Sequence, residues 1–323
     1  MEEKTGKASD VLVSVDMLVY NHEKYLAQAI EGVLMQEGDF SIELLIHDDA
    51  STDRSPDIIR SYAEKYPQII KPIFQRENQY SQGVSILGEF EIPRYSGKYV
   101  AYCEGDDYWI DPRKLQKQVA FLEAHPDFVA VGHNVKVVDG DGNDYTGSTP
   151  KRWTRMPDYE FTLKETDKHQ MFGQTASRVF RNFWKDRPEL VEWFNEAAHA
   201  HGDTKMSLIA SCLGRIWVMS DVMSAYRLTT TGTSWTARSR GTNQAERKIQ
   251  SLCEEIRLAE QLGKPLTLHS EFEKTLYMAV RKRLQDPSED NKQILAFVWE
   301  RYPFKRTAAW SITKQVLISL LKR

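Results

Sequence analysis

Two adjacent carboxylates follow an apolar run one third of the way along the chain. Residues 102–109 read Tyr-Cys-Glu-Gly-Asp-Asp-Tyr-Trp, and the acid pair is Asp106 and Asp107. Carboxylates this close repel one another unless a cation or hydrogen-bond donors hold them. Carboxylate oxygens are also the ligands that hard divalent cations prefer. The pair therefore predicts a metal or ligand site in a tight loop.

A second acid pair, Asp48-Asp49, follows another apolar run. From the residues alone, each pair has a structural alternative, because Asp106-Asp107 would also suit a solvated turn and Asp48-Asp49 an Asx-turn. A third acidic position, Asp203, comes after a glycine and before an apolar helical pattern, which is also how a helix N-cap looks. Both readings of each site stay open at this point.

The apolar runs that precede the two acid pairs have the composition of buried strands. We expect strands, separated by helical patterns, over residues 11–19, 42–46, 69–74, 98–103 and 128–131. Such alternation predicts an α/β fold with a mostly parallel sheet sandwiched by helices. Since the carboxyl ends of parallel strands lie at one edge of the sheet, the two acid loops can face one ligand.

Two of the helices are expected to begin at a polar residue followed by proline. Ser55 would cap a helix that has Pro56 in its first turn, and Asp111 would cap one that has Pro112 there. Residues 139–168 show no clear period. From about residue 244 the pattern is helical throughout, with candidate helices over 244–262, 269–285, 289–301 and 307–322.

Composition limits the functions that the chain can have. Its 323 residues are 41% hydrophobic, which is enough to bury a core, and the net charge of -3 makes nucleic acid a poor candidate partner. The three cysteines form neither a disulfide framework nor a metal pattern, which fits a reducing cytosol. We expect neither a signal peptide nor a spanning helix, because no apolar run is long enough.

Three pieces of sequence in order carry a family resemblance: Val13-Ser-Val with Tyr20-Asn21, Asp48-Asp49-Ala-Ser-Thr-Asp53, and Glu104-Gly-Asp106-Asp107. Together they resemble family 2 of the nucleotide-sugar glycosyltransferases, inverting enzymes with the GT-A fold. The resemblance implies a polar tail over 1–10 and a GT-A domain over 11–230. The donor half of that domain would be 11–135 and its acceptor half 136–230, followed by a helical region over 231–323.

The resemblance also assigns roles at the donor site. Tyr20 would stack near the nucleotide base and Asp49 would accept a hydrogen bond from it. Asp106 would touch the ribose or the donor sugar, and Asp107 would coordinate Mn²⁺ or Mg²⁺ that bridges the two phosphates. Residues 172–177 look like the small-residue strand that lines the donor-sugar pocket, which makes Thr175 a pocket residue.

Asp203 is similar in its setting to the general base of inverting relatives. It would take the proton of an acceptor hydroxyl as that hydroxyl attacks the anomeric carbon. Tyr226-Arg227 resembles the pair that closes the GT-A domain, but the histidine that many relatives carry shortly afterwards is missing, since Leu228 is followed by three threonines. This departure leaves the third protein ligand of the metal unassigned.

The resemblance implies transfer of a sugar from a nucleotide diphosphate donor, with uridine favoured, to a glycan or lipid-linked glycan in bacterial surface polysaccharide synthesis. The alternatives are a nucleotidyltransferase that makes nucleotide sugars and a catalytically silent nucleotide-sugar binder. The expected location is the cytoplasm. The amphipathic segment 307–322 suits peripheral contact with the inner face of the membrane or packing, on its own domain or in a homodimer, and packing is favoured.

Overall fold

The structure is a computed structural model that describes residues 11–147, 149, 151–228 and 244–304. Its contacts divide the chain into two compact units. Within the described residues, the first unit holds 11–161, 172–195 and 213–228, and the second holds 162–171, 196–212 and 244–304. The expected tail over 1–10, the expected domain boundary near 230 and the expected helix over 307–322 lie outside the described residues.

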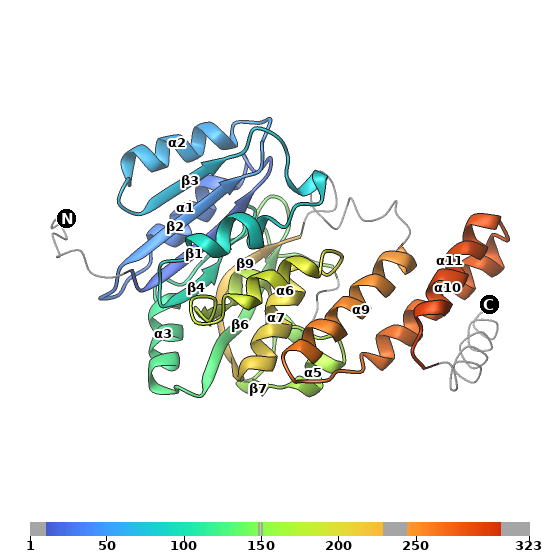
Figure 1. Cartoon of the computed structure of the whole chain (residues 1–323). Coiled ribbons are helices and arrows are strands. Elements are labelled where there is room, and N and C mark those ends of the chain that lie inside the picture. Colours follow the sequence, from blue (N-terminus) through green and yellow to red (C-terminus); the bar gives the residue numbers. More distant parts are fainter. Residues whose placement is uncertain (1–10, 148, 150, 229–243, 305–323) are drawn as a thin grey trace. The chain divides into compact units, whose positions relative to one another are not determined.

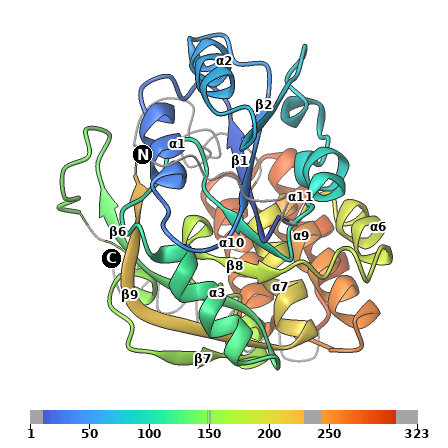
Figure 2. The ribbon, with the colours of Figure 1, turned by 90° about the vertical axis from the view of Figure 1, so that its left-hand side faces the viewer.

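The first unit is built on one mixed sheet, as predicted (Figure 1). Its strands are β1 (Val13–Val19), β2 (Ile42–Asp48), β3 (Ile70–Phe74), β4 (Tyr99–Tyr102), β5 (Tyr108–Trp109), β6 (Phe128–Val138), β7 (Tyr159–Phe161), β8 (Val179–Arg181) and β9 (Arg215–Arg227). The order is β3-β2-β1-β4-β8-β6-β9-β5, with β7 paired to β9. Strands β1 to β4 pair in parallel, and β8 is antiparallel to both β4 and β6. Figure 2 shows β9 running beside β6 and β7.

Helices of the first unit cover one face of the β1–β4 part of this sheet. They are α1 (Leu26–Leu34), α2 (Ser55–Lys65) and α3 (Lys114–Ala124), and the unit also contains α4 (Lys151–Thr154) and α6 (Glu189–Glu196). Alternate residues of β1, from Val13 to Val19, are buried in one apolar cluster with side chains of α1, α2 and α3. The period of two along the strand therefore places the core on the helical face.

The opposite face of β1 is buried and polar. Ser14 donates from its hydroxyl to Glu43 of β2 over 2.6 Å, and the Tyr95 hydroxyl donates to the buried Asp16 carboxylate. The chain that covers this face consists of short helical turns, η1 (Tyr80–Gln82), η2 (Leu87–Glu91) and η3 (Ile92–Arg94). Buried polar groups on this face are hydrogen-bonded by this covering segment and by neighbouring strands.

Both predicted helix caps are wrong. Helix α2 includes Ser55 as its first residue, and the Ser55 hydroxyl accepts from the backbone N–H of His22 instead. Helix α3 begins at Lys114, and Asp111 accepts from the backbone N–H of Arg113 in the turn before it. In both places the side chain that was expected to cap the helix accepts a hydrogen bond from a backbone N–H outside the helix.

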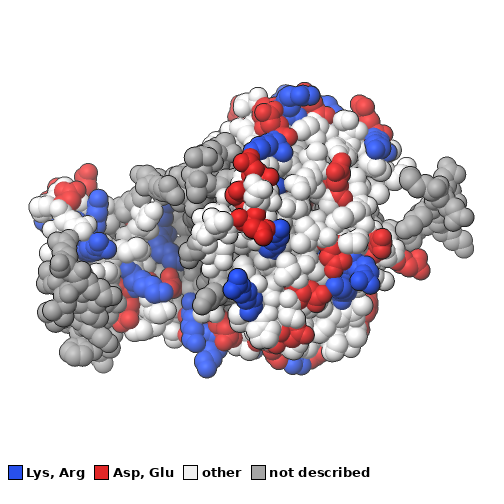
Figure 3. All heavy atoms as spheres, turned by 180° about the vertical axis from the view of Figure 1, so that it is seen from behind, with Lys and Arg blue, Asp and Glu red and all other residues white. Residues whose placement is uncertain are grey.

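The second unit is helical and contains α5 (Leu163–Asp167), α7 (Gly202–Leu213), α9 (Gln244–Gln261), α10 (His269–Gln285) and α11 (Glu289–Arg301). The last three confirm the helical pattern predicted after residue 244. None of the helices in the described part of the chain is long and apolar enough to span a membrane. Acidic and basic side chains are intermixed on the molecular face in Figure 3.

Helix α1 packs so closely on β5 that it has no room for a side chain at Gly32. A Cβ there would lie 2.9 Å from the backbone nitrogen of Trp109 and 3.0 Å from its carbonyl oxygen. We expect Gly32→Ala to lower the free energy of unfolding by about 1–3 kcal/mol, although alanine favours helix, because backbone cannot move aside easily. Urea unfolding measures this difference, and a variant as stable as the wild type would contradict the close approach.

Candidate functional site

The loops after β1 and β2 are joined by hydrogen bonds at the carboxyl ends of the strands. The backbone N–H of Asn21 donates to the Ser51 hydroxyl over 2.9 Å, and that of Thr52 donates to the Asn21 side-chain oxygen over 2.7 Å. Asn21 and Ala50 both have left-handed backbones, with φ of 57° and 59°. Left-handed backbone at a non-glycine residue costs free energy, so these cross-loop bonds hold the loops in a strained shape.

The loop with Asp106 and Asp107 packs against the loop that follows β1. The backbone N–H of Gly105 donates to the Leu18 carbonyl over 3.0 Å, and a Cβ on Gly105 would lie 2.8 Å from His22 Nδ1. Glycine is therefore required at this close approach. The prediction that the acid loops meet at one edge of the sheet is confirmed.

Asp107 is buried at this edge, with 1% of its surface exposed. Its Oδ1 accepts from the backbone N–H of Arg227 over 2.8 Å, and its Oδ2 accepts from Gln174 Nε2 over 2.7 Å. The two donors lie 120 and 67 residues away in the sequence. A buried carboxylate requires such partners, and no local pattern predicted them.

Burial raises the pKa of Asp107 well above its usual range, and the negative charges of Asp106 and Glu104 raise it further. The hydrogen bonds from Arg227 and Gln174 oppose these effects. A cation at this loop would offset the repulsion among the three carboxylates and favour ionised Asp107. The local chemistry thus fits a cation, although Asp107 already bonds two donors.

The rest of the cation's ligands would have to come from a bound molecule or water. Among the residues that the structure describes, no three His, Cys, Asp or Glu side chains are close enough to hold a metal ion together. Mg²⁺ is often held by one or two carboxylates plus phosphate oxygens and water. The residues present fit that arrangement and do not fit a cage made of protein ligands.

Arg227, the last residue of β9, connects the acid loop to neighbouring segments. Its guanidinium donates to the Asp106 carbonyl over 3.0 Å and to the Gln28 side chain over 2.8 Å. It also lies over the rings of Tyr25 and Tyr108, at 4.4 and 5.3 Å from their centroids. Arg227 is buried and joins the acid loop to α1 and β5 through these contacts.

A second set of contacts joins the loop of Asp106 and Asp107 to the segment that precedes β8. The Trp109 indole N–H donates to the Ala176 carbonyl over 3.0 Å, and the Lys114 ammonium lies 4.1 Å from the Trp109 ring centroid. Lys114 donates to Gln118, which in turn donates to the Ser177 carbonyl over 2.8 Å. Trp109 is buried, so it packs in the core, and it ties the acid loop to the segment that carries Gln174.

The segment over 172–177, expected to be a strand, is a turn. Its Thr175 lies in η4 (Thr175–Ser177), a single 3-10 turn, and β8 begins only at Val179. Gly173 has a φ of 69°, which turns the chain before a strand can form. Thr175 remains next to Gln174, the partner of Asp107, and is partly exposed.

Asp49 is buried, with 3% of its surface exposed, and it anchors the chain before η1. Its two oxygens accept from the backbone N–H groups of Gln79 over 2.6 Å and Tyr80 over 3.1 Å. Each carboxylate oxygen has two lone pairs, so acceptor capacity is left for a ligand. Asp48 accepts from the backbone N–H of Ser51, three residues on, over 3.2 Å, and Tyr20 directly follows β1.

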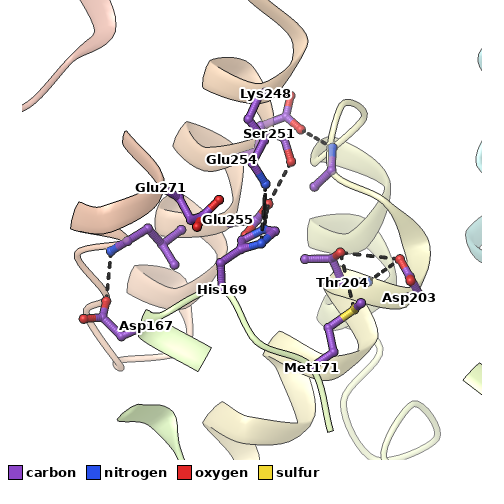
Figure 4. Close-up of polar contacts among 12 residues, drawn as sticks. Asp167, His169, Met171, Asp203, Thr204, Lys248, Ser251, Glu254, Glu255 and Glu271 are labelled. Carbon is purple, nitrogen blue, oxygen red and sulfur yellow. Dashed lines mark hydrogen bonds and ion pairs between the residues drawn. The ribbon is translucent and has the colours of Figure 1, made fainter. Parts of the chain in front are cut away.

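Asp203 belongs to the second unit, whereas the other predicted site residues belong to the first. It lies in the first turn of α7, after Gly202, and is therefore not the N-cap of that helix. Its Oδ1 accepts from the backbone N–H of Thr204 over 2.7 Å (Figure 4). Asp203 is thus a residue of the first helical turn and does not occupy the N-cap position.

Comparisons with known proteins identify the class. The family model described as glycosyl transferase family 2 matches residues 14–186. The chain is 34% identical over 222 residues to the uncharacterized protein Rv1520 of Mycobacterium tuberculosis, covering 67% of this chain and 58% of that one. It is 33% identical over 156 residues to TuaG of Bacillus subtilis, named for teichuronic acid biosynthesis, covering 48% and 58%.

A solved structure shows the same fold. S. aureus TarS, crystallised in complex with UDP-GlcNAc, superimposes with a TM-score of 0.64 at 17% identity, over 94% of this chain and 88% of that one. The first unit therefore has the GT-A type of fold. The chain belongs to glycosyl transferase family 2, and it spans 58% of the length of the curated relative Rv1520.

Burial of Lys114 makes stability depend on pH. It lowers the pKa of Lys114 to about 7, whereas a lysine in the unfolded chain titrates near about 10.4. The neutral form is thus favoured in the folded state, so this contribution is full at high pH and is lost as the pH falls toward 7. We expect the unfolding free energy of wild type, relative to Lys114→Met, to be higher at about pH 9.5 than at about pH 7.

Urea unfolding of both proteins at the two pH values measures this difference. The exposed Lys65, substituted in the same way, is the matched control and should show no such dependence. A difference between wild type and Lys114→Met that does not change with pH would mean that Lys114 stays charged in the folded chain.

Proposed function

We propose that the chain transfers one sugar from a uridine diphosphate donor to a hydroxyl of a glycan or lipid-linked glycan, with inversion at the anomeric carbon. The observation that carries this proposal is the buried Asp107 carboxylate, held by Gln174 and Arg227 where three strand-end loops meet in a family 2 chain. The UDP-GlcNAc bound by TarS supports uridine as the nucleoside.

At the donor site, each proposed role agrees with the residue's surroundings. Asp49 keeps acceptor capacity for the N–H of a uracil-like base, and Tyr20, in the neighbouring loop, would stack on that base. Asp106 is partly exposed beside Asp107 and would touch the ribose or the sugar. Thr175, next to Gln174, would contact the donor sugar.

A bound Mn²⁺ or Mg²⁺ would neutralise the charge that develops on the departing diphosphate. Asp107 is the residue that would hold it, with the diphosphate and water as the remaining ligands. Gln174 and Arg227 would fix the direction of the Asp107 carboxylate, and the repulsion from Asp106 and Glu104 favours a cation there.

Asp203 would act as general base, accepting the proton of the acceptor hydroxyl on its carboxylate. It lies in the first turn of α7, directly after Gly202. An ionised carboxylate is the form that can accept the proton.

The polymer in question is proposed to be a bacterial surface polysaccharide. The name of TuaG, which refers to teichuronic acid biosynthesis, supports this, as does the general resemblance in sequence. The proposed place of the reaction is the cytoplasm, at the inner face of the membrane, where a lipid-linked acceptor could be reached.

Asp203→Asn tests the transfer step. With Mn²⁺, a panel of nucleotide sugars including UDP-GlcNAc and a bacterial glycan extract, we expect wild type to release uridine diphosphate. We expect the variant to be slower by about 100-fold or more, since it lacks a proton acceptor, with nearly unchanged affinity for uridine diphosphate. Coupled detection of nucleoside diphosphate measures the rate, and calorimetry measures the affinity.

No release by the wild type with any donor would contradict the proposal. Formation of pyrophosphate from a nucleoside triphosphate and a sugar phosphate would favour the nucleotidyltransferase alternative instead. Full turnover of Asp203→Asn would remove Asp203 from the mechanism while leaving the transferase itself in place.

Asp107→Ala tests the cation. We expect Mn²⁺ to raise the affinity of the wild type for uridine diphosphate, and we expect the variant to lose about tenfold or more of that affinity. Calorimetry with and without Mn²⁺ measures both effects, and the exposed Asp186→Ala serves as the matched control. Equal affinity of wild type and Asp107→Ala under both conditions would rule out a cation held by Asp107.

A further inference from the structure

Two neighbouring acids on α9, Glu254 and Glu255, bind the two segments that surround Asp203 in the second unit (Figure 4). One segment is the chain that leads into α7, and the other is the turn after α5. Both acids are well covered, with 13% of the Glu254 side chain and 2% of Glu255 exposed. We call these two residues the α9 acid pair.

Glu254 holds the chain that enters α7. Its Oε2 accepts from the backbone N–H groups of His199 over 2.7 Å and Ala200 over 3.0 Å. Its Oε1 lies 2.5 Å from Nδ1 of the His199 ring. Ala200 is three residues before Asp203, so this carboxylate fixes the backbone from which the first turn of α7 starts.

Glu255 holds the turn that follows α5. Its Oε2 lies 3.2 Å from His169 Nε2, its Oε1 accepts from the Ser251 hydroxyl over 2.7 Å, and Lys248 Nζ lies 3.0 Å from the same His169 nitrogen. His169 has a left-handed backbone, with φ of 55°, a conformation that persists only where contacts impose it. The turn is closed by backbone hydrogen bonds at the end of α5, from His169 to Thr166 and from Gln170 to Glu165, and Glu255 and Lys248 contact the His169 ring.

The His169 turn reaches Asp203 through two more residues. Met171 follows two positions later, and its sulfur accepts from the Thr204 hydroxyl over 3.8 Å. The backbone N–H of Thr204 donates to Asp203 Oδ1. Glu255, His169, Met171 and Thr204 also line one small void of about 10 Å³, which has room for a single water at most. Glu255 and Thr204 therefore lie at the same small void.

Burial would raise the pKa of Glu255, but the hydrogen bond and charge of His169, together with the charge of Lys248, hold this pKa below its usual range. A buried charge of this kind adds little net stability compared with apolar packing of the same volume. What it does supply is a fixed arrangement of its partners, since a charged acceptor tolerates few geometries.

We infer that the α9 acid pair consists of positioning residues for Asp203, so that the helical region after residue 244 takes part in the transfer reaction. Glu254 sets the start of α7, and Glu255 acts through His169, Met171 and Thr204 on the Asp203 carboxylate. The inference rests on the proposed role of Asp203 as general base. It gives the helical region a part in catalysis that does not depend on contact with the nucleotide-sugar donor.

The test uses the full chain with Glu254→Gln and Glu255→Gln, each of which keeps the side-chain size and removes the charge. Glu260→Gln, an exposed position on the same helix, is the matched control. We expect kcat for uridine diphosphate release, with the fastest donor of the panel, to fall about tenfold or more in both variants and to be unchanged in the control. Affinity for uridine diphosphate should stay at the wild-type value, and the loss of kcat should exceed what any fall in melting temperature explains.

Glu255→Asp, which restores the charge, should recover part of the lost kcat. A kcat equal to that of Glu260→Gln in both variants would overturn the inference. It would also be overturned if kcat fell only in proportion to a lower melting temperature and a weaker affinity for uridine diphosphate, because the acids would then serve stability alone. If Glu255→Gln does not fold, Glu254→Gln decides between these outcomes.

Asp203→Asn in the same assay separates this inference from the proposed function. Loss of turnover in Asp203→Asn with normal kcat in both α9 variants overturns the positioning role and leaves the general base in place. Full turnover in Asp203→Asn overturns the general base, and the positioning role with it.

Discussion

The first unit is organised around one constraint, which is that the Asp107 carboxylate is buried and must find donors. Its own neighbours in sequence, Asp106 and Glu104, only add repulsion. The donors come from Gln174 before β8 and Arg227 at the end of β9. Satisfying one carboxylate therefore brings together three distant parts of the chain, and the edge of the sheet where they meet is the candidate donor site.

In the second unit too, covered carboxylates bind donors from distant parts of the chain. Glu254 and Glu255 are covered acids that contact His199 and His169, which lie 55 and 86 residues earlier in the chain. In both units the strained backbone lies near the predicted chemistry, at Asn21 and Ala50 in one and at His169 in the other.

The sheet, its acid loops and the later helices could be predicted from the sequence because each depends on local periodicity and strand-end chemistry. The caps at Ser55 and Asp111 could not, since a hydrogen bond outside the helix decides where each side chain goes. The turn at Thr175 escaped prediction because a small-residue run suits a strand equally well until Gly173 adopts a positive φ. The donors to Asp107 left no local signal, as they are far away in sequence.

The bond between Asp107 and the Arg227 backbone has a consequence for synthesis on the ribosome. The strands β1 to β4 pair among themselves and can assemble once about a third of the chain has emerged, but Asp107 gains its second donor only after residue 227 is free. Until then the Asp107 carboxylate lacks this donor and has to remain hydrated. The loop that carries it therefore stays open to water. A nascent chain that stops before β9 would thus have paired strands β1 to β4 but would lack one of the two donors to Asp107.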